Sequence, residues 1–140
     1  MEVAPADCSD GMIWGPDNVM FLCTSPLPKS VGAGLENTQT IAGDSRIVVS
    51  AAQACLSYES GGFQDWFLPS LEELRSIRAL TDNPIGPGIF ASAPYWSSSA
   101  EDYDLLMIPS QVYAFDPVKS SWNVVKYVGE LLRVRAARRF

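Results

Sequence analysis

The stretch GGFQDWFLPSLEEL, residues 61–74, runs from a glycine pair through aromatic residues into a serine and two glutamates. Ser70 and Glu73 have the S-x-x-E spacing of a capping box, in which each side chain accepts a hydrogen bond from the other residue's backbone N–H. The spacing predicts a helix over 71–80. The helix should end before Asp82-Asn83-Pro84, because the residue that precedes a proline is disfavoured in the α region.

Apolar residues recur at helical spacing after the cap, at Leu71, Leu74, Ile77 and Leu80. They predict one buried stripe, with Glu72 and Arg75 paired on the solvated side. Upstream, Phe63, Trp66 and Phe67 are expected to fill the space between this helix and an earlier one. The stretch therefore has a structural interpretation, which we favour over a catalytic one.

The composition indicates one globular domain, 1–140, with residues 1–10 as a linker or terminal arm. The chain has 140 residues, of which 47% are hydrophobic, and 16 acidic residues against 10 basic ones give a net charge of −6. A domain of this size can bury a substantial core. The negative charge argues against nucleic acid or an anionic membrane as a general partner, because both require a positive face.

The chain contains no histidine. This excludes Ser/His/Asp and Cys/His nucleophile systems and histidine-ligated metals, all of which need an imidazole. Glu72 and Glu73 cannot act as an acid/base pair, because helical neighbours point about 100° apart. We therefore expect no enzymatic activity, no catalytic residue, no metal and no cofactor.

Three cysteines, Cys8, Cys23 and Cys55, are too far apart for a CxxC motif or a zinc ribbon. One disulfide with one free thiol and three reduced cysteines are equal alternatives, and Cys23–Cys55 is the preferred bridge. No signal peptide and no run of about 18 apolar residues is visible, so membrane insertion is not expected. If the protein is exported, the chain is expected to be a fragment or part of a larger particle.

The remaining pattern predicts an α+β fold. The first forty residues are interrupted by glycine and proline and are expected to be loops over a small β element. A second helix is expected between 45 and 58. Short β-type runs then follow at 95–99, 111–115, 122–127 and 131–136. In the last run the alternation predicts that Arg133 and Arg135 share one strand face, paired with acidic residues of the first half of the chain.

Four short motifs occur in order: Gly34-Leu35-Glu36-Asn37-Thr38, residues 61–70 with Glu73-Leu74, Tyr95-Trp96-Ser97-Ser98-Ser99 and Val134-Arg135-Ala136. Together they resemble the C-terminal domain family of the Legionella collagen-like adhesin, over residues 10–140. The resemblance implies a C-type-lectin-like fold, related to phage receptor-binding tips and retroelement variable proteins. In that fold two helices pack on a small twisted antiparallel sheet with long loops, and the N- and C-terminal strands pair.

The resemblance also implies a function. Such domains display binding surfaces on cells or fibre tips, often as homotrimers, and recognise glycans or proteins, so an extracellular, cell-surface or virion-associated location is expected. The chain departs from the family at 111–119, where Pro117 stands in place of a glycine-type turn. The geometry of this loop, and with it the ligand, therefore cannot be transferred from the family.

The segment from 101 to 127 is expected to form the exposed binding face. Aromatic rings with nearby amides suit sugar stacking or protein anchoring. The candidate ligand-binding residues are Tyr103, Tyr113, Lys119, Trp122, Asn123, Lys126 and Tyr127. Core packing is an equal alternative for Trp122.

Two other groups of charged residues have simpler explanations. Glu101, Asp102 and Asp104 are expected to form a solvated acidic loop rather than a calcium site. The arginines from 133 to 139 could meet sulfated glycans, although pairing within the fold is favoured. The sequence as a whole predicts a non-enzymatic display domain that binds a surface receptor, a glycan or an envelope component, as in an adhesin or a phage tail-fibre tip. The alternative is a fibre-tip assembly module whose aromatic face is a subunit interface.

Overall fold

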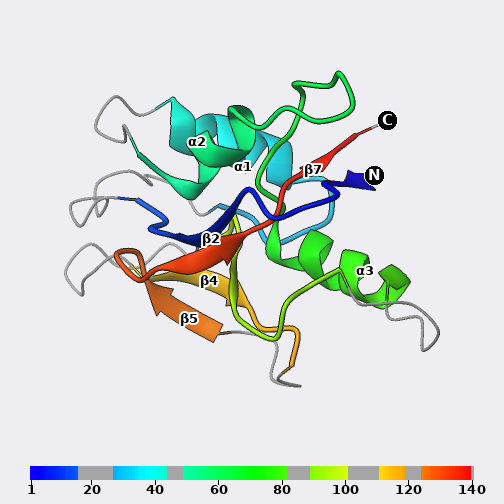
Figure 1. Ribbon diagram of the computed structural model, residues 1–140. Coiled ribbons are helices and arrows are strands. Elements are labelled where there is room, and N and C mark those ends of the chain that lie inside the picture. The colour runs from blue at the N-terminus through cyan, green and yellow to red at the C-terminus, as the bar shows by residue number, and fades with distance from the viewer. Residues whose placement is uncertain (16–26, 44–48, 82–88, 101–110, 119–123, 140) are drawn as a thin grey trace.

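A computed structural model describes residues 1–15, 27–43, 49–81, 89–100, 111–118 and 124–139 (Figure 1). In this part of the chain the helices are α1 (Gly34–Ala42), α2 (Ala51–Leu56) and α3 (Leu71–Thr81). The strands are β1 (Glu2–Val3), β2 (Ser9–Met12), β3 (Tyr95–Trp96), β4 (Gln111–Phe115), β5 (Val124–Tyr127), β6 (Leu132–Val134) and β7 (Ala137–Arg138). The predicted α+β class is confirmed. No helix in the described residues is both long and apolar enough to cross a membrane.

The two ends of the chain pair with each other. β1 and β7 form an antiparallel ribbon with Glu2 opposite Arg138 and Val3 opposite Ala137, so the pairing of terminal strands is confirmed. The N and C labels accordingly lie near each other in Figure 1. Residues 1–10, expected to be a linker or terminal arm, therefore supply strand β1 and Ala4, which is buried.

The larger sheet has the order β2-β6-β3-β4-β5. Its pairs are antiparallel except β3–β6, which is parallel at Tyr95 and Arg133, so the predicted antiparallel pairing is confirmed for the other three pairs. In Figure 1, α1 and α2 lie on one side of β2 and β6, and the β4–β5 hairpin lies on the other.

Helix α1 was not predicted from the sequence, where loops were expected in this region. It begins at Gly34, and the preceding residue, Ala33, makes no side-chain capping bond. A short helix that opens on glycine without a cap carries no start signal. Helix α2 begins after Ser50, whose hydroxyl accepts from the Gln53 backbone N–H at 3.1 Å, and it ends at Leu56. It is shorter than the predicted 45–58 segment, of which 45–48 lie outside the described residues.

The capping box of α3 is confirmed. The Ser70 backbone N–H donates to Glu73 Oε2 at 2.8 Å, and the Glu73 N–H donates to Ser70 Oγ at 3.3 Å. Leu71, Leu74 and Ile77 are buried, as predicted. Leu80 is 84% exposed, and its predicted burial is wrong because it lies about one turn beyond Ile77, where the packed stripe ends.

The aromatic residues before the cap divide into two groups. Trp66 is buried and meets the Tyr58 ring edge-on at 5.5 Å, while Phe67 packs with Ile77 and Leu35 between α3 and α1. Both rings are buried, as predicted, but Trp66 packs with α2 and Phe67 with α3 in separate clusters, rather than together between those two helices. Phe63 is 42% exposed, so its predicted packing is wrong, and the Arg138 guanidinium covers its ring at 3.5 Å from the centroid.

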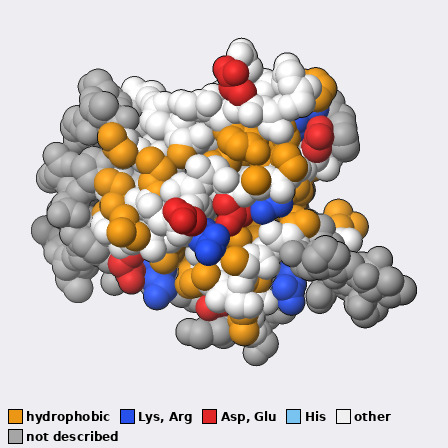
Figure 2. All heavy atoms as spheres, viewed as in Figure 1, with side chains coloured by type: hydrophobic (Ala, Val, Ile, Leu, Met, Phe, Trp, Pro, Cys, Tyr) orange, Lys and Arg blue, Asp and Glu red, His pale blue; other side chains and the backbone are white. Residues whose placement is uncertain are grey.

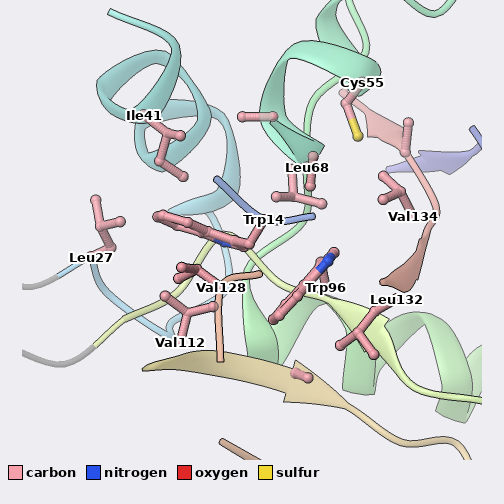
Figure 3. Close-up of a cluster of buried hydrophobic side chains, with 14 of the residues drawn as sticks. Trp14, Leu27, Ile41, Cys55, Leu68, Trp96, Val112, Val128, Leu132 and Val134 are labelled. Carbon is pink, nitrogen blue, oxygen red and sulfur yellow. The ribbon is translucent and has the colours of Figure 1, made fainter. Parts of the chain in front are cut away.

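Two tryptophans occupy the centre of the main core. Trp14 and Trp96 lie among aliphatic side chains from α1, α2 and the sheet (Figure 3). Each indole N–H donates to a backbone carbonyl of another segment. Trp14 Nε1 donates to Ser97 O at 2.9 Å, and Trp96 Nε1 donates to Met12 O at 2.6 Å. The rings therefore connect the N-terminal segment to β3 by both packing and hydrogen bonds.

The four motifs that were separate in the sequence are joined by buried hydrogen bonds. The Leu68 N–H donates to Thr38 Oγ1 at 3.0 Å, and the Ser98 N–H donates to Pro69 O at 2.9 Å. The Leu71 N–H donates to Ser99 Oγ at 3.0 Å. Ala137, which directly follows the terminal motif, exchanges reciprocal backbone bonds with Phe67, at 2.8 and 3.0 Å. The extended segment 66–70 is therefore the element on which the other motifs meet.

Replacing Thr38 by valine tests this junction. The substitution removes a buried hydroxyl and leaves the Leu68 N–H unsatisfied, so we expect urea denaturation to show a loss of about 2 kcal/mol in the free energy of unfolding. Thr40→Val is the matched control, because Thr40 lies on the same helix with an exposed hydroxyl, and it should cost less than about 0.5 kcal/mol. Equal losses in the two variants would show that the junction does not depend on Thr38.

Candidate functional site

Four of the seven predicted ligand-binding residues, Tyr103, Lys119, Trp122 and Asn123, lie outside the described residues. The acidic residues Glu101, Asp102 and Asp104 do so as well. Their predicted roles therefore remain predictions.

Tyr113 is placed in the interior. It lies on β4 between β3 and β5, is 5% exposed, and packs with Leu71, Leu74 and Phe115. Lys29 Nζ lies 4.9 Å from its ring centroid. The prediction that Tyr113 belongs to an exposed face is wrong, because α3 covers this side of the strand.

Lys126 and Tyr127 are neighbours on β5, at an edge of the sheet. Lys126 is partly exposed and lies 3.9 Å from Glu130 Oε1, a separation at which a surface ion pair contributes little. The backbone of Tyr127 pairs with Gln111, and its side chain lies outside the described residues.

The β4–β5 hairpin divides the predicted binding segment. Residues 101–110 join the described chain at Gln111, the start of β4, while 119–123 join it beyond the other end, after Val118. The five residues of β4 separate its ends by roughly 13 Å. The segments 101–110 and 119–123 thus join opposite ends of one strand, so the predicted binding segment 101–127 is interrupted by β4 and β5.

Asp7 binds Arg133 on β6 and Arg135, the residue that follows this strand. Arg133 and Arg135 donate to its two carboxylate oxygens at 3.0 and 2.9 Å, and the Tyr95 hydroxyl donates at 3.0 Å. The predicted pairing with an acid of the first half is confirmed. Burial raises the pKa of Tyr95, as does the nearby Asp7 charge, so the phenol remains a donor. On the face shown in Figure 2, basic and acidic side chains lie close together over β2 and β6.

Arg138 connects both chain ends to the 61–67 loop. It donates to Glu2 Oε2 at 2.7 Å and forms a bidentate pair with Asp65, at 2.7 and 3.1 Å. The hydrogen bond from Arg138 lowers the pKa of Asp65. Arg133, Arg135 and Arg138 are therefore all engaged within the fold, which argues against a sulfate-binding role for them.

A surface cavity of about 330 Å³ lies beside this cluster. We call it the Arg139 pocket. Its lining comes from α1, α2, the 61–67 loop and the C-terminal end, namely Leu35, Gln39, Leu56, Gln64, Asp65, Trp66, Phe67 and Arg139. The volume is at the lower end of the range of about 300–1,000 Å³ that is typical of small-molecule sites.

The Arg139 pocket combines aromatic walls with polar groups at its rim. Arg139 is exposed, donates to Gly32 O and lies 5.9 Å from the Phe67 ring centroid, and no carboxylate pairs with it among the described residues. Gln39 and Gln64 add amides, and Gln64 Nε2 donates to Glu59 Oε1 at 2.6 Å. Amides and a guanidinium can bind sugar hydroxyls or a carboxylate. In the described residues, no group of three or more Cys, Asp or Glu side chains could hold a metal ion.

Sequence reasoning missed this pocket. Its residues come from segments around 35–39, 56, 64–67 and 139, and no local pattern connects them. The 61–67 motif was the only indication that part of this region is specialised, and it was interpreted as core packing.

The preferred Cys23–Cys55 bridge is wrong. Cys55 is a buried free thiol on α2, and it is in hydrogen-bond contact with the thiol of Cys8. Cys23 lies outside the described residues. The fold brings α2 against the N-terminal arm, a proximity that cysteine spacing alone cannot indicate.

Replacing Asp7 by alanine should destabilise the fold strongly. The guanidinium of Arg135, 8% exposed, would lose its carboxylate, and removing one partner of a largely buried pair costs about 3 kcal/mol. Glu130→Ala removes the acid of an exposed pair and should cost less than about 1 kcal/mol. Chemical denaturation of both variants measures the difference, and a loss below 1 kcal/mol for Asp7→Ala would contradict the role assigned to it.

The Asp65–Arg138 pair predicts a pH dependence. Because the folded pKa of Asp65 is below its unfolded value of about 3.9, the pair stabilises the fold above that value and is lost as the pH falls through the folded pKa. A carboxyl NMR titration should find the Asp65 pKa below the ordinary aspartate range in the native chain and closer to it in Arg138→Gln. An Asp65 pKa that does not change in the variant would contradict the assignment.

Comparison of this chain with family models, with curated proteins and with solved structures finds no match. The family resemblance carried by the four motifs therefore remains a prediction.

Proposed function

We propose that this chain is a non-enzymatic, C-type-lectin-like display domain that recognises a surface receptor, either a glycan or a cell-envelope component. Its place of action would be extracellular, on a cell surface or on a virion, and homotrimers would present it. The receptor contacts would come from the loops of 101–127, with Tyr103 and Lys126 as the first residues to test.

The observation that carries the proposal is the junction of the four motifs. Segments that were quoted for the resemblance contact one another through buried bonds, such as Leu68 N to Thr38 Oγ1 and Ser98 N to Pro69 O. These buried hydrogen bonds stabilise the fold and leave no reactive group exposed among them. A display domain needs such a rigid framework to support its binding surface. The paired terminal strands are also consistent with the C-type-lectin-like fold.

The attachment of the loops supports the same function. Ala100 precedes the segment 101–110 and pairs with Leu27, donating to its carbonyl at 3.1 Å and accepting from its N–H at 3.0 Å. Gln111 follows the segment and begins β4. A loop anchored at both ends to paired backbone can vary in sequence without disturbing the core.

The Arg139 pocket favours a glycan among the possible ligands. Its rim amides and the Arg139 guanidinium can bind the hydroxyl groups of a sugar, and its apolar lining can contact the ring carbons. It would hold one sugar unit next to the framework, in addition to the loop contacts.

Binding of the full chain to a glycan array and to whole cells tests the proposal. We expect Tyr103→Ala with Lys126→Ala to weaken binding at least about tenfold, equivalent to about 1.4 kcal/mol. Gln39→Ala with Arg139→Gln tests the pocket, and Leu80→Ala is a control on an exposed helix face. If only the pocket variants lose binding, the loop assignment fails, and if the native chain binds no glycan and no cell surface, the function fails.

The position of β5 at the edge of the sheet favours one alternative function, in which the chain is an assembly module. Among the described strands β5 pairs only with β4, and an exposed sheet edge can add a strand from a second copy. Light scattering of Lys126→Pro, which would disrupt that edge, separates the two functions. Loss of the oligomer in a folded chain favours assembly, whereas an intact oligomer with weakened binding favours recognition.

A further inference from the structure

Two cysteines that are distant in the sequence meet beside β6. Cys8 immediately precedes β2, and its backbone N–H donates to Val134 O at 2.8 Å. Cys55 is fully buried on α2, and its sulfur points toward the strand that carries Val134 (Figure 3). The two thiols are in hydrogen-bond contact, and Cys8 packs against the hydrophobic cluster that contains Cys55.

The surroundings of the two thiols differ. Cys8 is only partly buried, and the hydrogen bond from Cys55 lowers its pKa, with a smaller contribution from the Ala136 backbone. Burial raises the pKa of the Cys55 thiol, and the hydrogen bond to Cys8 raises it further. Because the thiolate is the attacking species, Cys8 is the thiol suited to react first.

We propose that Cys8 and Cys55 are a redox modification site, at which a small-molecule disulfide converts the thiol pair into an intramolecular disulfide. The Cys8 thiolate attacks one sulfur of the reagent, breaking its S–S bond and releasing one thiolate. Cys55 then attacks the Cys8 sulfur of the mixed disulfide and transfers its proton to the departing sulfur, which leaves as the second thiol. The two protein thiols lose two electrons and two protons in total, and the reagent becomes two thiols.

The cross-link would fasten the N-terminal arm to α2. Asp7, next to Cys8, holds Arg133 and Arg135, so the link would also limit the motion of this ion-pair cluster. A disulfide across the long loop between residues 8 and 55 restricts the unfolded chain substantially. We expect oxidation to raise the Tm by about 10 °C.

Equilibration of the native chain with oxidised glutathione, followed by peptide mapping without reductant, tests the proposal. The expected product is a peptide pair joined through Cys8 and Cys55, together with a higher Tm that returns to its original value with dithiothreitol. Cys23→Ser is the matched control and should retain both effects, while Cys8→Ser should lose both. Cys8 is partly exposed and Cys55 is buried, so Cys8→Ser is the variant less prone to misfold.

Three outcomes would overturn the proposal. These are a linked peptide that contains Cys23, free Cys8 and Cys55 thiols after equilibration, and a cross-link that forms in Cys8→Ser through Cys55 and Cys23. A Cys8–Cys55 peptide with no change in Tm would overturn the stabilising effect.

Discussion

The extended segment from Trp66 to Ser70 is buried but is not part of a regular sheet, and this constraint organises the molecule. Buried backbone N–H and C=O groups must find partners, since each one left unsatisfied costs about 1–3 kcal/mol. Here the partners come from remote segments. Thr38 Oγ1 accepts a hydrogen bond from the Leu68 N–H, and the Ser98 N–H donates to Pro69 O. The backbones of Ala137 and Phe67 exchange two hydrogen bonds. Satisfying one short segment thus brings α1, the segment after β3 and the C-terminal strand together.

Glu73 adds a second constraint at the same place. Its carboxylate accepts from the backbone N–H groups of Ser70 and Gly32, at 2.8 and 2.9 Å, so the α3 cap also holds the turn that leads into α1. The approach is close enough that a Cβ at Gly34 would lie 2.1 Å from Glu73 Oε2 and 2.9 Å from the Ser70 nitrogen. Only glycine fits at the start of α1, and the same requirement deprives that helix of a recognisable cap.

This framework determines where a ligand can bind. Arg133 on β6 forms an ion pair with Asp7, and Arg138 on β7 forms ion pairs with Glu2 and Asp65. These arginines near the C-terminus therefore stabilise the fold. Arg139 differs, because its guanidinium faces a pocket with aromatic walls. A ligand in the Arg139 pocket would therefore contact the framework without disrupting the buried hydrogen bonds that join the motifs.

Elements that depend on neighbouring residues could be predicted from the sequence alone. The α3 cap follows from Ser70 and Glu73, strand β4 matched 111–115, and alternation placed Arg133 and Arg135 on one strand face. Five features could not be predicted in this way: helix α1, the parallel pairing of β3 with β6, the burial of Tyr113, the Arg139 pocket and the contact of Cys8 with Cys55. Each of these depends on which distant segments meet. Which segments meet depends on where the buried backbone N–H and C=O groups find hydrogen-bond partners. A local pattern of apolar residues does not indicate those partners.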